Sequence, residues 1–444
     1  MLQMTTRRRA RAFVAALSCA GLLATGLPST AAGSPLDSLA AGSLGSSTGT
    51  TAPGAPETPV EPDPVEPDPT EPIDDGDPTL PTVTVVATGG TLAGRATTQD
   101  SYSNYRAGTY PMAELIPEIA PAIDQMANVD IVQFGNAGSG GYTIAQYREL
   151  TLAVERALAS SDAVVVTTGT DTMEEFGYWL DVTVQSKKPV VITGAMRPWA
   201  AGPTPDVDPV FGSDGPANLL QSIRLAASQQ TYCFGTVLML NDEIHAARDV
   251  TKGNTMRTDT FESRRVGVLG WIDGDRISLP RGPSRVLDCQ SDRWFTPFDL
   301  SEISAGDLPK VEIFYNYQEA SGDAIRGMVA GGATGIVTAG TGAGGISSAA
   351  GQARRDAITQ GVWFVSTSRT GSGTVGPTSA AGMISGNELL PQKARLLLIL
   401  SRAFTDDITV ARDWFATAGN PGFGNASAAV DVQSVPDGVL EQVA

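Results

Sequence analysis

The amino-acid sequence predicts an α/β protein with a larger N-terminal domain, whose parallel-rich sheet is flanked by helices, and a smaller C-terminal α/β domain. Short apolar runs alternate with segments of helical periodicity, which is the order typical of parallel sheets. Several of these runs end in turns rich in glycine and threonine, the place where open parallel sheets bind ligands. The length of 444 residues accommodates more than one domain.

The N-terminal domain is predicted over residues 82–278. The run Val-Thr-Val-Val at 83–86 predicts its first strand, because apolar and β-branched residues favour a buried strand. Further strands are expected at 130–133, 163–168, 189–193 and 235–240, and helices at 144–159, 172–186 and 218–228. The alternation of strand and helix indicates a parallel, doubly wound sheet.

The C-terminal domain is predicted over residues 310–444, after an interdomain linker at 279–309. Apolar runs at 310–316, 333–340 and 361–368 predict three strands. The segment 391–400 has the spacing of an amphipathic helix. These elements indicate a second, smaller α/β unit.

The first 32 residues have the order of a secretory signal peptide. Four arginines between positions 7 and 11 precede an apolar run that ends near Leu27, and small residues at 29–32 offer a cleavage site. The apolar run is too short for a stable membrane span. Residues 33–81 are rich in proline and acid, which predicts a disordered linker. The sequence therefore predicts a secreted protein, either extracellular or held at the cell surface.

The composition limits the partners that the protein can have. A formal net charge of −18 repels phosphates, so no nucleic-acid partner is expected. The single histidine, His245, is predicted to be structural, and the residues do not indicate a metal site or a cofactor. Two cysteines follow the signal region, Cys233 and Cys289. They could form a disulfide in an exported protein, and Cys233 could equally be a buried thiol.

The turn after the first strand is the first candidate for a functional site. Its sequence, Ala-Thr-Gly-Gly-Thr-Leu-Ala-Gly at 87–94, presents the hydroxyls of Thr88 and Thr91 beside glycines that leave the backbone uncrowded. An ordinary tight turn between a strand and a helix is the alternative. The spacing matches neither GxGxxG nor a Walker loop, so no nucleotide is implied.

Three more loops follow predicted strands. Residues 166–175, Val-Thr-Thr-Gly-Thr-Asp-Thr-Met-Glu-Glu, place a dense run of hydroxyls and carboxylates at a helix start, and capping explains only one or two of them. Gly-Ala-Met-Arg-Pro at 194–198 follows the next strand. The fourth loop contains Lys252, and a loop lysine is usually solvated unless the fold buries it beside a hydroxyl that it can activate.

Together these motifs resemble those of bacterial type II L-asparaginases, the exported members of the asparaginase/glutaminase family. The resemblance spans residue 82 to the C-terminus, and its most specific parts are 87–94 and 166–175; the segments 194–198 and 248–252 also agree. It implies an amidohydrolase that converts L-asparagine and water to L-aspartate and ammonia through a threonine-bound acyl-enzyme, without a cofactor. The loop after Pro198 is several residues longer than is usual in the family.

The resemblance also assigns catalytic roles to matching positions. Thr91 would be the nucleophile, and Tyr105, on a mobile lid, would help to take its proton. Thr170, Asp171 and Lys252 would form a second group of hydroxyl, carboxylate and amine, in which Thr170 activates water or acts more directly. A threonine hydroxyl is a weak nucleophile without a base, and a desolvated lysine or a perturbed tyrosine can supply one.

Substrate recognition is where the sequence departs from the family. Ser139 matches the serine that holds the α-carboxylate, and the backbone of Ala195 matches the carbonyl that receives the leaving amide. Gly140 stands where a glutamine or glutamate usually contacts the α-amino group, although Asp171 could still bind that ammonium as an ion pair. Ala343 replaces an asparagine of the family's Gly-Asn-Gly-Asn turn. Selectivity between asparagine and glutamine is therefore left open.

The resemblance further implies a homotetramer built from intimate dimers, in which the smaller domain completes the neighbouring subunit's site. The acidic residue that commonly crosses this interface has no clear counterpart in the sequence. Two alternative functions are consistent with the sequence. One is hydrolysis of glutamine or another amide by the same site, and the other is a non-catalytic surface binding protein that uses this fold.

Overall fold

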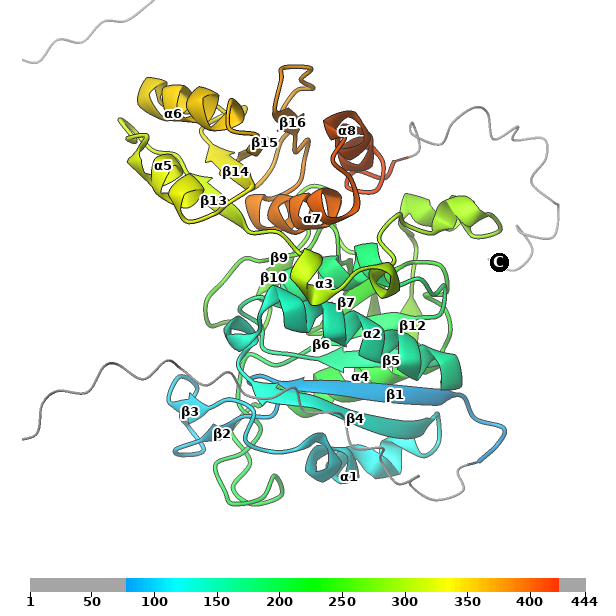
Figure 1. Ribbon diagram of the computed structural model, residues 1–444. Helices are drawn as coiled ribbons and strands as arrows, with labels where there is room; N and C mark the ends of the chain where they lie inside the picture. The colour runs from blue at the N-terminus through cyan, green and yellow to red at the C-terminus, as the bar shows by residue number, and fades with distance from the viewer. Residues whose placement is uncertain (1–76, 423–444) are drawn as a thin grey trace, which may run out of the picture. The chain divides into compact units, whose positions relative to one another are not determined.

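The computed structural model describes residues 77–422 (Figure 1). The predicted signal peptide and most of the predicted linker at 33–81 lie outside the described residues. Between residues 77 and 422 the chain forms two large sheets, each flanked by helices, and two small two-stranded pairs. The predicted α/β fold class, with a larger parallel-rich sheet and a smaller α/β domain, is confirmed.

The larger sheet has eight strands in the order β12-β11-β8-β7-β6-β5-β1-β4. The five strands from β7 to β4 are parallel, as predicted, and β8, β11 and β12 extend the sheet in antiparallel fashion. Asn241 and Asp242 adopt φ of 54° and 62° between β7 and β8, which permits a two-residue hairpin turn. The strands are β1 (Thr82–Gly89), β4 (Asn128–Ala137), β5 (Ala163–Thr167), β6 (Val190–Thr193), β7 (Thr236–Leu240), β8 (Glu243–Ala246), β11 (Gly270–Asp273) and β12 (Arg276–Ser278).

Helices cover both faces of this sheet: α1 (Met112–Ile123), α2 (Ile144–Ser160), α3 (Met173–Thr183) and α4 (Gly215–Ala227). Successive strand side chains point to opposite faces, so Val86 packs with α2 and α3 while Val85 packs with α1 and α4. Both faces are buried, which explains why the strands are continuous apolar runs. Helix α1 was not predicted, because Pro117 and Pro121 interrupt its pattern.

The smaller sheet has four parallel strands in the order β13-β14-β15-β16. One face packs against α5 and α6, and the other packs against α7, which also contacts α3 of the larger domain (Figure 1). The predicted helix at 391–400 is part of α7. The elements are β13 (Val311–Tyr315), α5 (Asp323–Ala330), β14 (Gly335–Gly340), α6 (Ser348–Ile358), β15 (Trp363–Ser368), β16 (Met383–Ser385), α7 (Pro391–Phe404) and α8 (Ile408–Ala416).

Several short elements lie outside the two large sheets and the α-helices. The two-stranded pairs are β2 (Arg95–Ala96) with β3 (Tyr105–Arg106) and β9 (Thr251–Lys252) with β10 (Phe261–Glu262). Single 3₁₀ turns occur at η1 (Ser139–Gly141), η2 (Ser284–Asp288), η3 (Asp292–Trp294), η4 (Leu300–Glu302) and η5 (Ala305–Asp307). Four of these turns, η2 to η5, lie within the predicted interdomain linker at 279–309.

Cys233 and Cys289 form a disulfide, with their Cα atoms 5.7 Å apart. Of the two alternatives for Cys233, the free buried thiol is wrong. The bond ties the turn before β7 to the segment that leads toward the smaller domain. In the part of the chain that the structure describes, no helix combines the length and apolar character needed to cross a membrane.

Candidate active site

The turns that follow β1 and β5 are in direct contact. Gly90 has φ of +79°, and a Cβ there would lie 2.3 Å from the backbone nitrogen of Gly169, so only glycine fits. A Cβ on Gly169 would in turn lie 2.9 Å from the backbone nitrogen of Ser139. The chain segments that carry Thr91, Thr170 and Ser139 are therefore adjacent, as expected for the carboxyl ends of neighbouring parallel strands.

Thr91 and Tyr105 form the first functional pair. The Oγ1 of Thr91 lies 2.7 Å from the hydroxyl oxygen of Tyr105, and either atom can donate the proton. Thr91 is only 6% exposed, while Tyr105 is partly buried on the β2–β3 hairpin. A short, direct hydrogen bond between a hydroxyl and a titratable phenol is the geometry that proton transfer requires.

The long loop after Pro198 holds the hairpin that carries Tyr105. The backbone nitrogen of Ala96 donates to the carbonyl of Ala200 at 2.8 Å, and that of Phe211 donates to the carbonyl of Gln99 at 2.9 Å. This loop therefore packs against the predicted lid. These two hydrogen bonds hold the hairpin on which Tyr105 lies beside Thr91.

Lys252 joins the second group of predicted residues. Its Nζ donates to Thr170 Oγ1 at 2.9 Å and to Asp171 Oδ1 at 2.6 Å. The Lys252 side chain is 15% exposed, so it is not an ordinary solvated loop lysine. The Asp171 side chain is 86% exposed, and solvent screening leaves this ion pair little weight in stability. What the pair provides is orientation of an amine beside a hydroxyl.

Ser139 and Gly140 lie in the η1 turn at the same edge. Ser139 is buried, and its Oγ accepts a hydrogen bond of 3.1 Å from the backbone nitrogen of Thr172. This bond satisfies a free N–H at the start of α3, where Thr172 makes no side-chain cap of its own. A Cβ on Gly140 would meet no atom within 4 Å, so the position is open.

Ala195 is fully buried in the turn after β6, and two residues missed by sequence reasoning hold that turn. The carboxylate of Asp214 accepts from the backbone nitrogens of Met196, at 2.9 Å, and Arg197, at 2.9 Å. The Nδ2 of Asn218 donates to the carbonyl of Gly194 at 3.0 Å. Burial raises the pKa of Asp214, although these backbone hydrogen bonds act in the opposite direction.

The remaining candidates stand apart from this group. His245 is buried, with Nδ1 3.1 Å from Ser263 Oγ and Nε2 3.4 Å from a carboxylate oxygen of Glu243, as a structural residue would be. Ala343 is exposed in the turn after β14 of the smaller sheet. Among residues 77–422, no cluster of three His, Cys, Asp or Glu side chains could hold a metal ion.

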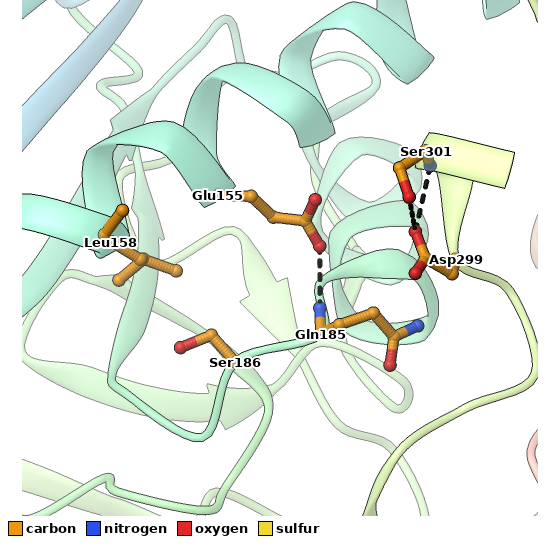
Figure 2. A pocket seen from close by; sticks show the side chains of 7 residues that line it. Glu155, Leu158, Gln185, Ser186, Asp299 and Ser301 are labelled. Atoms are coloured by element: carbon orange, nitrogen blue, oxygen red, sulfur yellow. Dashed lines mark hydrogen bonds between the residues drawn. The ribbon is translucent and has the colours of Figure 1, made fainter.

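A cavity of about 340 Å³ lies away from these residues, on the side of α2. It is lined by Glu155, Leu158, Ala159, Gln185, Ser186, Asp299 and Ser301. Figure 2 shows Glu155 accepting a hydrogen bond of 2.9 Å from the Gln185 backbone nitrogen. Burial raises the pKa of Glu155. None of the predicted site residues lines this cavity, so it is not the candidate active site.

Paired hydroxyls at the carboxyl edge of a parallel sheet, one beside a phenol and one beside an amine, define an α/β enzyme site suited to nucleophilic chemistry. Comparison with known families agrees. Residues 82–285 match the family described as Asparaginase, N-terminal, and residues 310–415 match the Glutaminase/Asparaginase C-terminal domain. The chain belongs to the asparaginase/glutaminase family, and it is a hydrolase of that family.

The match to individual relatives spans most of the length of each relative. L-asparaginase 2 of Bacillus subtilis is 38% identical over 333 residues, which cover 74% of this chain and 84% of that protein. L-asparaginase 2 of Escherichia coli is 36% identical, over 74% of this chain and 90% of that protein. The crystal structure of a probable cytoplasmic L-asparaginase from Campylobacter jejuni is 32% identical with a TM-score of 0.69, covering 76% of this chain and 99% of that one.

Proposed function

We propose that this protein hydrolyses L-asparagine to L-aspartate and ammonia through an ester on Thr91. The observation that carries the proposal is the 2.7 Å hydrogen bond between Thr91 and Tyr105, on a turn in contact with the turn of Thr170 and Asp171. The choice of substrate is supported by relatives that are named L-asparaginase and are 34–38% identical.

The first half of the reaction forms the ester. Tyr105 accepts the proton of Thr91 Oγ1 while that oxygen attacks the carbon of the side-chain amide. The carbonyl oxygen takes the negative charge. The C–N bond then breaks as Tyr105 passes the proton from Thr91 to the nitrogen, which leaves as ammonia, and the carbonyl forms again in the ester. The buried turn at Ala195, fixed by Asp214 and Asn218, is assigned to the leaving amide.

The second half returns the free enzyme. A water molecule, activated by Thr170 with Lys252 as its neighbour, attacks the ester carbon. The bond to Thr91 Oγ1 breaks, L-aspartate is released and Thr91 regains its proton. Ser139 is assigned to the substrate's α-carboxylate and the exposed Asp171 to its ammonium, while Gly140 contributes no side chain.

Ammonia release by the purified protein tests this function. L-asparagine and L-glutamine are compared in parallel, with Thr91→Ala as the nucleophile variant. Thr359→Ala, at an exposed threonine directly after α6, is the matched control. We expect release from asparagine in the wild type and the control but not in Thr91→Ala. Release only from glutamine would reassign the substrate, and no release from either would favour the binding-protein alternative.

We further propose export of the protein through the signal sequence at 1–32, as in the type II branch of the family. The Cys233–Cys289 disulfide supports an oxidising compartment. A relative from Haemophilus influenzae is named as probably periplasmic, whereas the solved Campylobacter jejuni relative is titled probably cytoplasmic. The mass of the protein recovered from culture medium and from cells tests export. An uncleaved protein confined to the cytoplasm would contradict it.

We also propose the domain boundaries and the oligomeric state. We place the catalytic domain at 82–278, the connection at 279–309 and the smaller domain at 310–444, with four chains in a homotetramer of intimate dimers. The match of separate families to 82–285 and 310–415 supports the division. Light scattering tests the assembly: the mass of four chains is expected, and a monomer that retains full activity would refute it.

A further inference from the structure

Lys393 is a buried lysine to which the proposed mechanism gives no role. Its side chain is 0% exposed, and its Nζ donates to the backbone carbonyls of Ala247 at 2.8 Å, Arg248 at 2.9 Å and Val250 at 2.5 Å. An ammonium has three N–H donors and no acceptor, so these contacts use its full hydrogen-bonding capacity. Lys393 is thereby tied to one turn of the larger domain.

The position of Lys393 is unfavourable for local stability. It is in the first turn of α7, which begins at Pro391, and the helix macrodipole disfavours a cation there. Burial lowers the pKa of Lys393 to about 8, with the Glu174 carboxylate acting in the opposite direction. A buried cation at a position that is unfavourable for local stability indicates that its contacts serve another purpose, such as function.

The turn held by Lys393 leads directly to Lys252. Val250, whose carbonyl makes the shortest contact with Lys393, is followed by β9, which consists of Thr251 and Lys252. Phe261 of β10 pairs with Lys252 from the other side. The backbone of Lys252 is therefore fixed between a paired strand and a turn anchored to the smaller domain.

Gln392, the residue before Lys393, contacts the segment that follows Thr170 and Asp171. Gln392 Nε2 donates to Glu174 Oε2 at 3.1 Å. Glu174 is buried in the first turn of α3, directly after the loop that carries Thr170 and Asp171. Helices α3 and α7 pack together, so this hydrogen bond is part of a continuous contact (Figure 1).

We propose that Gln392 and Lys393 are positioning residues, which together set the place of Lys252 relative to Thr170 and Asp171. Lys393 holds the turn that precedes Lys252. Gln392 holds the start of α3, which follows Thr170 and Asp171. The smaller domain thus fixes the catalytic geometry within its own chain. This inference rests on the proposed function, because it assigns a role in that reaction.

The test uses isosteric variants that lack the donors. Lys393→Met leaves the Ala247–Val250 turn without its anchor, and Gln392→Met removes the bond to Glu174. Lys310→Met and Gln352→Met are the matched controls. Lys310 donates to the carbonyl of Gly331 and Gln352 donates to Asp356, both in the smaller domain and outside this contact. Circular dichroism and thermal unfolding establish that each variant is folded before kinetics are measured.

The two variants should change kcat and KM in different proportions. A general loss of stability would not produce this difference. Lys393→Met displaces the amine, and we expect kcat to fall about 100-fold with KM within about threefold of the wild type. Gln392→Met loosens the loop that also carries Asp171, the proposed ligand of the ammonium. We expect it to lower kcat and raise KM, each on the order of 10-fold. Both controls should keep wild-type values.

Different results test the proposed function and the positioning role. If the wild type releases ammonia and Lys252→Met does not, the catalytic group stands. Folded Lys393→Met and Gln392→Met proteins with wild-type kcat and KM would then overturn the positioning role. Should Lys393→Met not fold, Gln392→Met decides alone: unchanged kinetics refute the role, and a combined change in kcat and KM supports it.

Discussion

We expect Glu175 to make the stability of the protein depend on pH between about 4.5 and 6. This residue is in the first turn of α3, where burial raises its pKa from 4.5 to about 6, against the opposing effect of the Arg395 guanidinium. The nearby Glu174 raises the pKa further, and Lys393 lowers it. In this pH window the folded protein binds more protons at Glu175 than the unfolded chain does, so the free energy of unfolding falls as pH rises.

The size of the effect follows from the shift. A pKa raised from 4.5 to about 6 corresponds to about 2 kcal/mol of destabilisation, complete above pH 6 and absent below 4.5. A glutamine at this position resembles the protonated acid. The Glu175→Gln variant should therefore match the wild type near pH 4 and exceed it by up to about 2 kcal/mol at pH 7.5.

Urea unfolding at fixed protein concentration, from pH 4 to pH 7.5, measures this difference. Glu302→Gln, at an exposed glutamate of the η4 turn, shows what removal of a surface carboxylate does alone. A difference between Glu175→Gln and the wild type that stays constant with pH would contradict a raised pKa at Glu175 in the folded protein. So would a variant that becomes relatively less stable as pH rises.

Three further predictions concern the site and its scaffold. Tyr105→Phe should lower kcat by about 100-fold with little change in KM, measured by ammonia release, because the base is lost; an unchanged kcat would exclude that role. Asp214→Asn should lower kcat/KM on the order of 10-fold in the same assay, because two backbone N–H groups lose a charged acceptor; full activity would show that the turn holds without it. Replacement of Cys233 and Cys289 by serine should cost about 4 kcal/mol in urea unfolding, given their separation of 56 residues, while kcat is retained. An unfolding free energy equal to the wild type would contradict this estimate.

Much of the fold is predictable because parallel strands buried on both faces appear as continuous apolar runs. Residues 83–86 and 163–168 illustrate this, since β1 and β5 are buried along almost their whole length. The antiparallel strands β8, β11 and β12 are short and lack a strong apolar run. Hairpin turns join β7 to β8 and β11 to β12, whereas β8 and β11 pair across a segment of more than 20 residues. Helix α1 contains prolines that local propensity places outside helices.

The site was partly predictable for a similar reason. Thr91, Thr170 and Asp171 follow buried strands directly, so their place at the carboxyl edge of the sheet follows from the order of elements. Lys252 was assigned to this group only by the family resemblance, because its own loop does not show that its side chain is buried beside Thr170 and Asp171. Asp214 was likewise missed, since an acid near a helix start resembles an ordinary cap until its backbone partners are known.

The identity of the nucleophile is the central claim, and rapid acid quenching tests it most directly. Wild-type protein is mixed with L-asparagine, quenched during turnover and digested, and the peptides are examined by mass spectrometry for a β-aspartyl ester. We expect an ester on the peptide that contains Thr91 and none on the peptide that contains Thr170. An ester on Thr170, or turnover that persists in Thr91→Ala, would contradict it.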